Sequence, residues 1–129
     1  MDDLSRLRSI VEEQVGHSDF MLARLDIDGQ TFYGINAHGE AFDKPEGVTF
    51  QGQRHAEGHA LSKARRAGAS GGEATLYVDG VLPPCQWCKS SFAGFGRALD
   101  LDWLTVIGPN GYLGRYTRGG GYETIRKSF

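Results

Sequence analysis

Two short motifs, thirty positions apart, constrain this chain more than any other feature. The first is His55-Ala56-Glu57, and the second is Pro84-Cys85-Gln86-Trp87-Cys88, which holds the only two cysteines of the protein. Each motif stands at the start of a segment with helical character. One C-x-x-C cannot build a disulfide framework, so the pair indicates a metal clip or a redox site. If the two motifs act together, the fold must bring two helix N-termini side by side.

The order of apolar patterns and turn signals predicts a layered α/β domain in which helices pack on one mixed sheet. The chain of 129 residues is long enough for one core, so residues 1–129 are expected to form a single domain. The predicted elements are a helix over 3–15, strands over 20–27 and 31–36 joined at Asp28-Gly29, a loop over 37–53, a helix over 55–67, a strand over 74–78, a helix over 85–99, and strands over 103–107, 112–116 and 122–126.

Composition excludes several classes of protein. A hydrophobic fraction of 40% and a charged fraction of 23% are ordinary for a globular domain. No apolar run reaches the roughly 18 residues that a membrane span needs, and the acidic N-terminus does not resemble a signal peptide. We therefore expect no membrane partner and a cytoplasmic site of action. The net charge is -2, but residues through Glu46 carry ten acidic and four basic side chains, and the rest carry six acidic and ten basic.

The residue types of the two motifs suit a catalytic zinc ion. Two thiolates (Cys85 and Cys88) and one imidazole (His55) form a soft ligand set, and three protein ligands leave the fourth tetrahedral position for water. Helix N-termini favour the thiolate form of cysteine. Zinc lowers the pKa of a bound water towards about 7. Glu57, two residues after His55, is then placed to carry the water's proton to a departing amine.

Two other interpretations of these residues remain open. In the first, His59 completes a closed Cys2His2 site one helical turn after His55, which would make the protein a zinc-stabilised binding module. That site would leave Glu57 without a task, and a chain of this length does not need a metal to fold. In the second, Cys85 and Cys88 form a redox pair, which would leave both His55 and Glu57 unused.

The sequence resembles the cytidine deaminase superfamily, and within it the bacterial polymorphic-toxin DNA cytosine deaminases. The resemblance lies in His55-Ala56-Glu57-Gly58-His59-Ala60, in Cys85-Gln86-Trp87-Cys88, and in the segment Leu104–Pro109, with looser similarity over 31–116. It implies a cytidine-deaminase-like three-layer fold, a mixed five-stranded sheet with helices on both faces. It also implies that His55, Cys85 and Cys88 bind Zn2+, that Glu57 is the general acid/base, and that Asn36 contacts the sugar. The other interpretation of Asn36 is a turn residue.

The resemblance and the basic second half predict deamination of cytosine to uracil in DNA. Single-stranded DNA is the expected form, because moving a base out of a duplex costs a few kcal/mol. Pro84, Trp87 and Phe92 are candidates for contact with the base; the other interpretation of Trp87 and Phe92 is packing beside the core. The basic residues that could line a phosphate track are Arg54, Arg65, Arg66, Lys89, Arg97, Arg115 and Arg118, and the other interpretation of each is a solvated helix face.

Other deaminase substrates remain open. The tRNA adenosine deaminases share the histidine and the P-C-x-x-C, whereas the free-nucleoside cytidine deaminases usually have Cys where His55 stands. The resemblance also implies a bacterial toxin domain, carried at the C-terminus of a longer secreted protein and neutralised by an immunity protein.

Overall fold

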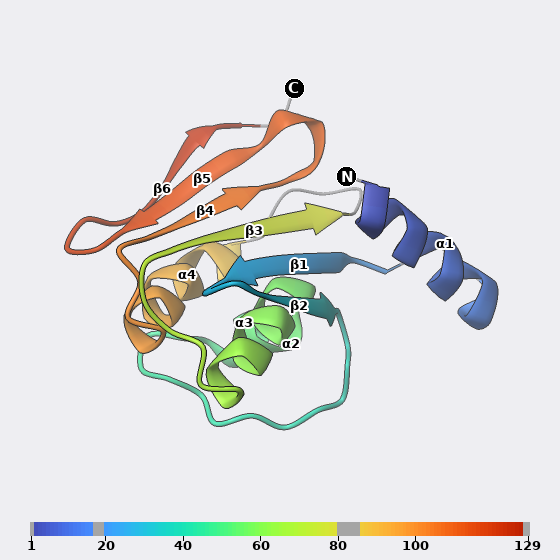
Figure 1. Cartoon of the computed structure of the whole chain (residues 1–129), viewed down its shortest axis with the longest axis horizontal. Helices are drawn as coiled ribbons and strands as arrows, with labels where there is room; N and C mark the ends of the chain where they lie inside the picture. Colours follow the sequence, from blue (N-terminus) through green and yellow to red (C-terminus); the bar gives the residue numbers. More distant parts are fainter. Residues whose placement is uncertain (1, 17–19, 80–85, 128–129) are drawn as a thin grey trace.

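One six-stranded sheet organises the structure, a computed structural model that describes residues 2–16, 20–79 and 86–127. The strand order is β2-β1-β3-β4-β5-β6, and every neighbouring pair is antiparallel except β3 and β4, which are parallel. Figure 1 shows the sheet and the helices around it. The elements are α1 (Asp2–Val15), β1 (Leu22–Ile27), β2 (Gln30–Ile35), α2 (Phe50–Arg54), α3 (Ala56–Arg66), β3 (Glu73–Asp79), α4 (Gln86–Ala98), β4 (Trp103–Ile107), the 3-10 turn η1 (Pro109–Gly111), β5 (Leu113–Thr117) and β6 (Gly121–Arg126).

Side chains alternate between two apolar layers, one on each face of the sheet. In β1, Ala23 and Leu25 point into the main core beneath α2, α3 and α4, whereas Leu22 joins a second cluster beneath α1. The period of two along a strand explains this division. The main core continues through fully buried residues such as Leu76 and Leu104. The α/β class with helices on both faces of a mixed sheet is therefore confirmed.

The hairpin between β1 and β2 has the predicted turn. Asp28 and Gly29 both have positive φ, at 51° and 71°. These angles match the right-handed twist of the flanking strands, which is why this dipeptide favours a two-residue hairpin. The register follows from it, with Ile27 opposite Gln30 and Leu22 opposite Ile35.

A glycine allows α3 to lie directly on the sheet. The side chain of a residue at position 34 would project from β2 towards α3, where a Cβ would overlap the carbonyl oxygen of Ala56 and lie 2.6 Å from the amide nitrogen of Ala60. Gly34 leaves that space to the helix backbone. The contact sets the distance of the first turn of α3 from β2.

The structure corrects three details of the predicted fold. The sheet has six strands where the resemblance implied five, because β6 pairs with β5 along its length. The region 37–53, predicted as a loop, contains the short helix α2, whose N-cap Thr49 accepts a hydrogen bond from the amide of Gly52. His55 is the N-cap of α3 and does not lie within the helix. No helix among the described residues is long and apolar enough to cross a membrane.

Replacing Gly34 by alanine is expected to destabilise the fold. The added methyl group must push α3 away from β2, and overpacking of this kind costs about 1–3 kcal/mol. Urea unfolding of Gly34→Ala measures the loss. Gly120→Ala is the matched control, since a Cβ there meets nothing nearer than 3.7 Å. Equal stability of the two variants would contradict the close approach of α3.

Candidate active site

The N-terminus of α3 and the first turn of α4 bring His55 and Cys88 together. The Nδ1 atom of His55 lies 3.2 Å from the Sγ atom of Cys88. His55 can reach the thiol because its side chain does not cap α3: the residue has an extended backbone (φ -78°, ψ 165°), and its side chain makes no capping hydrogen bond. Cys88 is 2% exposed. Two of the three predicted zinc ligands therefore meet at one point.

The remaining members of the second motif are not placed by the structure. Pro84 and Cys85 lie outside the described residues, and the side chain of Trp87 is likewise not described. The assignment of Cys85 as a metal ligand, and of Pro84 and Trp87 as substrate contacts, stays a prediction.

Glu57 lies in the first turn of α3 beside the same two side chains. It is 3% exposed, and Cys88 and His55 lie close enough to influence its carboxyl group. Burial raises the pKa of Glu57, and the backbone amide of Glu57, the Cys88 thiol and the nearby His55 offset this only in part. A raised pKa suits a carboxyl group that must both accept and release a proton.

His59, one helical turn after His55, already has a partner at each ring nitrogen. Its Nδ1 atom accepts a hydrogen bond of 3.0 Å from the backbone amide of Ile35, so the proton lies on Nε2, which is 2.6 Å from Oε1 of Glu40. Burial lowers the pKa of His59 and so favours the neutral ring. Neither nitrogen offers a free lone pair to a metal. This geometry disfavours the closed Cys2His2 site.

The sequence analysis missed a cluster formed by His38, Glu40 and His59. Their possible ligand atoms lie within 4.8 Å of one another, close enough to hold a metal ion. However, Nδ1 of His38 accepts the amide N–H of Glu40 and its Nε2 faces the carbonyl oxygen of Gln53, so this ring also lacks a free lone pair. The two imidazoles stack with centroids 3.9 Å apart. In this arrangement the cluster fastens the segment after β2 onto α3. Its one sequence signal is the second H-x-E, His38-Gly39-Glu40.

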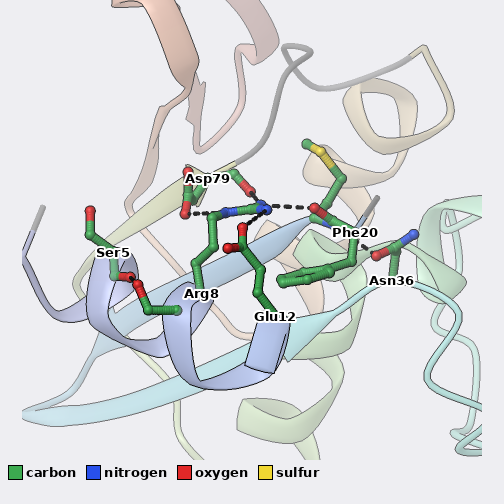
Figure 2. A network of polar contacts seen from close by, with 8 residues as sticks. Ser5, Arg8, Glu12, Phe20, Asn36 and Asp79 are labelled. Carbon is green, nitrogen blue, oxygen red and sulfur yellow. Dashed lines mark hydrogen bonds and ion pairs between the residues drawn. The ribbon is translucent and has the colours of Figure 1, made fainter. Parts of the chain in front are cut away.

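Asn36 follows β2 and joins it to the start of β1. Its side-chain Oδ1 atom accepts a hydrogen bond of 2.8 Å from the backbone amide of Met21 (Figure 2). The backbone amide of Asn36 in turn donates to the backbone carbonyl oxygen of Met21. The next residue, Ala37, donates to the carbonyl oxygen of Arg54, directly before His55. Asn36 therefore has a structural task and lies near the motif residues. Its Nδ2 atom makes no hydrogen bond within the described residues.

Arg8, on α1, is a second residue that the sequence did not single out. Its guanidinium donates to the carboxylate of Asp79 at 2.9 Å, to the carbonyl oxygen of Asp79 at 3.0 Å and to that of Phe20 at 2.8 Å (Figure 2). These bonds tie α1 to the end of β3 and to the residue before Met21. Nothing in the sequence around Arg8 indicated a partner 71 residues away in the chain.

The structure does not gather the basic residues into one track. Arg118 forms ion pairs with Asp100 and Asp102, at 3.0 and 3.2 Å. Arg115 alternates with the buried Tyr116 along β5, so it lies on the opposite face of the sheet from α3 and α4, beside the Trp103 ring. Phe92 is 1% exposed and packs against Tyr122 in the core, so the packing interpretation of Phe92 is confirmed and stacking on a base is not.

A family comparison gives this arrangement its context. A model of the MafB19-like deaminase family matches residues 3–99. The chain belongs to this family. Neither the curated proteins nor the solved structures gave a match. The matched region runs from α1 through the whole of α4 and contains His55, Glu57 and Cys88, whereas β4, β5 and β6 lie beyond it. Membership confirms the resemblance to deaminases at the level of the family, and implies a hydrolytic deaminase.

Glu57→Gln is expected to stabilise the metal-free protein at neutral pH. Because the folded pKa of Glu57 lies above its usual value of 4.5, stability falls as pH rises above 4.5 and the buried carboxyl group is forced to ionise. The neutral amide avoids this cost, and each kcal/mol recovered raises the melting temperature by about 4 °C.

Thermal unfolding of chelator-treated protein at pH 4.5 and pH 8 tests this. Glu57→Gln should have a higher melting temperature than the wild type at pH 8 but not at pH 4.5. Glu123→Gln, at an exposed position on β6, should leave the melting temperature unchanged at both pH values. A gain that is the same at both pH values would show that burial of charge is not the cause.

Proposed function

We propose that this protein hydrolyses cytosine to uracil in DNA, using a zinc ion held by His55, Cys85 and Cys88 and a proton carrier, Glu57. The observation that carries the proposal is the convergence of His55, Cys88 and Glu57 in the fold of a deaminase family. These are the residue types that zinc nucleobase deaminases use, with the glutamate acting on protons and not on the metal.

The described donors fit a zinc ion. Ligands that bind one tetrahedral zinc at about 2.1 Å (nitrogen) and about 2.3 Å (sulfur) lie about 3.6 Å apart. The 3.2 Å between Nδ1 of His55 and Sγ of Cys88 needs only a small opening to reach this separation. Cys88 is a buried thiol, and Cys85 is the proposed third ligand. When bound, the zinc would polarise a water molecule and so make it nucleophilic at neutral pH.

Glu57 would carry out the proton transfers of the reaction. Its carboxylate accepts a proton from the water that attacks C4 of cytosine, and then delivers it to the exocyclic amine as the C4–N bond breaks. Ammonia leaves, and the proton that remains on the C4 hydroxyl group moves to N3 to give uracil. The burial of Glu57 keeps bulk water from exchanging the transferred proton and raises the pKa of the carboxyl group, which favours its protonated form before the amine leaves.

Asn36 is the proposed contact to the sugar. Met21 fixes the side-chain oxygen of Asn36, which leaves the amide Nδ2 as the available donor. A hydroxyl or ring oxygen of the sugar would accept this hydrogen bond. Pro84 and Trp87, from the second motif, are the proposed contacts to the base.

Single-stranded DNA is the proposed form of the substrate. A flipped base costs least when the strand is unpaired. A duplex-opening enzyme needs strong attraction to the backbone or wedging side chains, whereas this chain is acidic overall, its Arg118 is ion-paired, and its Phe92 is buried. RNA, tRNA adenosine and free nucleosides are the competing substrates. We further propose that the domain acts in the cytoplasm as a bacterial toxin with an immunity protein as partner.

Zinc content distinguishes the three-residue site from a site that includes His59. Wild-type protein is expected to hold one zinc ion per chain, and Cys88→Ala is expected to lose it because a thiolate ligand is removed. His59→Gln should keep the metal, since both ring nitrogens of His59 already have other partners. Elemental analysis of the three purified proteins measures this. Equal loss of zinc in His59→Gln and Cys88→Ala would favour the closed binding module.

Genome sequencing tests the reaction and its substrate together. Cells that express the wild type are expected to accumulate C-to-T changes. Glu57→Ala should fold, bind zinc and lose about 10²- to 10⁴-fold in rate, so its genome should stay unchanged. In vitro, one labelled oligonucleotide offered in single-stranded and duplex form at matched salt should react faster as a single strand. A clean genome with edited tRNA adenosine would replace DNA cytosine as the substrate.

A further inference from the structure

Outside the candidate active site, the C-terminal half of α3 borders a cavity of about 590 Å3 lined by Ala41, Phe42, Asp43, Ser62, Arg65 and Arg66. We propose that this cavity binds a backbone phosphate of the substrate strand through the guanidinium groups of Arg65 and Arg66 and the hydroxyl of Ser62. The identity of the strand rests on the proposed function. The binding of phosphate rests on the cavity alone.

The two arginines are already oriented by the segment opposite them. Arg65 donates to the carbonyl oxygen of Asp43 at 3.2 Å, and Arg66 donates to that of Ala41 at 2.9 Å. The guanidinium of Arg66 also lies 4.0 Å from the centre of the Phe42 ring. A guanidinium has five N–H donors, so each arginine keeps several for a ligand, in a plane suited to two phosphate oxygens. The side chain of Arg66 is 57% exposed, so a ligand can reach it.

Ser62 supplies an unused polar group at the same cavity. Its hydroxyl is buried and makes no hydrogen bond with any described residue. A buried hydroxyl without a partner is unfavourable, and a ligand oxygen would remove that cost. Ser62 precedes Arg65 and Arg66 by three and four residues, so all three lie on one face of α3.

The charges around the cavity favour an anion. Arg65 and Arg66 face one carboxylate in the lining, that of Asp43. Glu40 adds a second negative charge beside the cavity, because its carboxylate accepts a hydrogen bond from His59 at 2.6 Å and forms an ion pair with Arg66 at 3.8 Å. Lys63 adds a third positive charge in the same turn of α3, so the cations still outnumber the carboxylates. The carboxylate of Asp43 weakens the attraction between the cavity and an anion but does not reverse it. Replacing Asp43 by a neutral residue should therefore strengthen the binding of an anion.

The position of the cavity sets the length of strand that can use it. Arg65 follows His55 by ten residues, or about 15 Å along the axis of α3. Stacked nucleotides rise about 3.4 Å within one strand, so the phosphate in the cavity would belong to a nucleotide about four positions from the target cytosine. Shorter substrates cannot fill both sites.

Binding of inorganic phosphate tests the site without any deamination. Phosphorus NMR titration should show binding to the wild type, about tenfold weaker binding to Ser62→Ala and loss of binding in the Arg65→Gln/Arg66→Gln double variant. Asp43→Asn should bind more tightly, a gain that a folding defect cannot imitate. Arg6→Gln is the control, because Arg6 is exposed on α1 across the sheet. Unchanged binding in all these variants would overturn the site.

Oligonucleotides then identify the source of the phosphate. On a Glu57→Ala background, which does not turn the substrate over, the double variant should lower the slope of log affinity against log salt by about 1 for each phosphate that the arginines no longer neutralise. In the active protein, the double variant should raise KM about tenfold and leave kcat unchanged when the strand is long enough to reach the cavity. For shorter strands, KM should not change. If the double variant no longer binds phosphate but binds the strand as the wild type does, the site takes a free anion and the assignment to the strand is overturned.

Discussion

The close contact between α3 and β2 determines where the chemistry of this protein can take place. Gly34 brings the helix backbone against the strand, and the amide of Ile35 donates to the ring of His59 across the same interface. Together these contacts fix both the height and the rotation of α3. The first turn therefore directs His55 and Glu57 towards α4, while His59 faces the segment that follows β2. A wider separation would leave the two motif helices without a common point.

Two histidines on α3, one turn apart, have opposite tasks because their neighbours differ. Cys88 is the partner of His55, whereas the backbone of β2 and Glu40 take both nitrogens of His59. The arrangement leaves Glu57 as the acid beside the thiol, where the effect of burial on its pKa exceeds that of the nearby His55. Stability is given up at this position, as is common where a buried acid must stay available for proton transfer.

Periodicity and turn chemistry were sufficient to predict the order of the strands and of the longer helices and the β1–β2 hairpin, but not α2, and the two motifs predicted that the N-termini of α3 and α4 would meet. The sequence could not reveal contacts that depend on tertiary placement. Arg8 bonds to Asp79, 71 residues later in the chain, and His38 stacks on His59 only because the loop returns to α3. The seven basic residues are spread along the second half of the sequence, and alternation along β5 places Arg115 on the face away from α3 and α4. The aromatic ring of Phe92 is of a type that can stack on a base, but the structure buries it in the core.

The strand order has a consequence for how the chain folds. Neighbours β4, β5 and β6 follow one another in sequence, so that this meander can form through fast local hairpins. The pairing of β1 with β3 instead joins Leu22 to Asp79, and it must close a long loop that includes α2 and α3. Contacts of such high sequence separation slow folding. Because β3 lies between α3 and α4 in the sequence, we expect the site formed by these two helices to assemble late in folding.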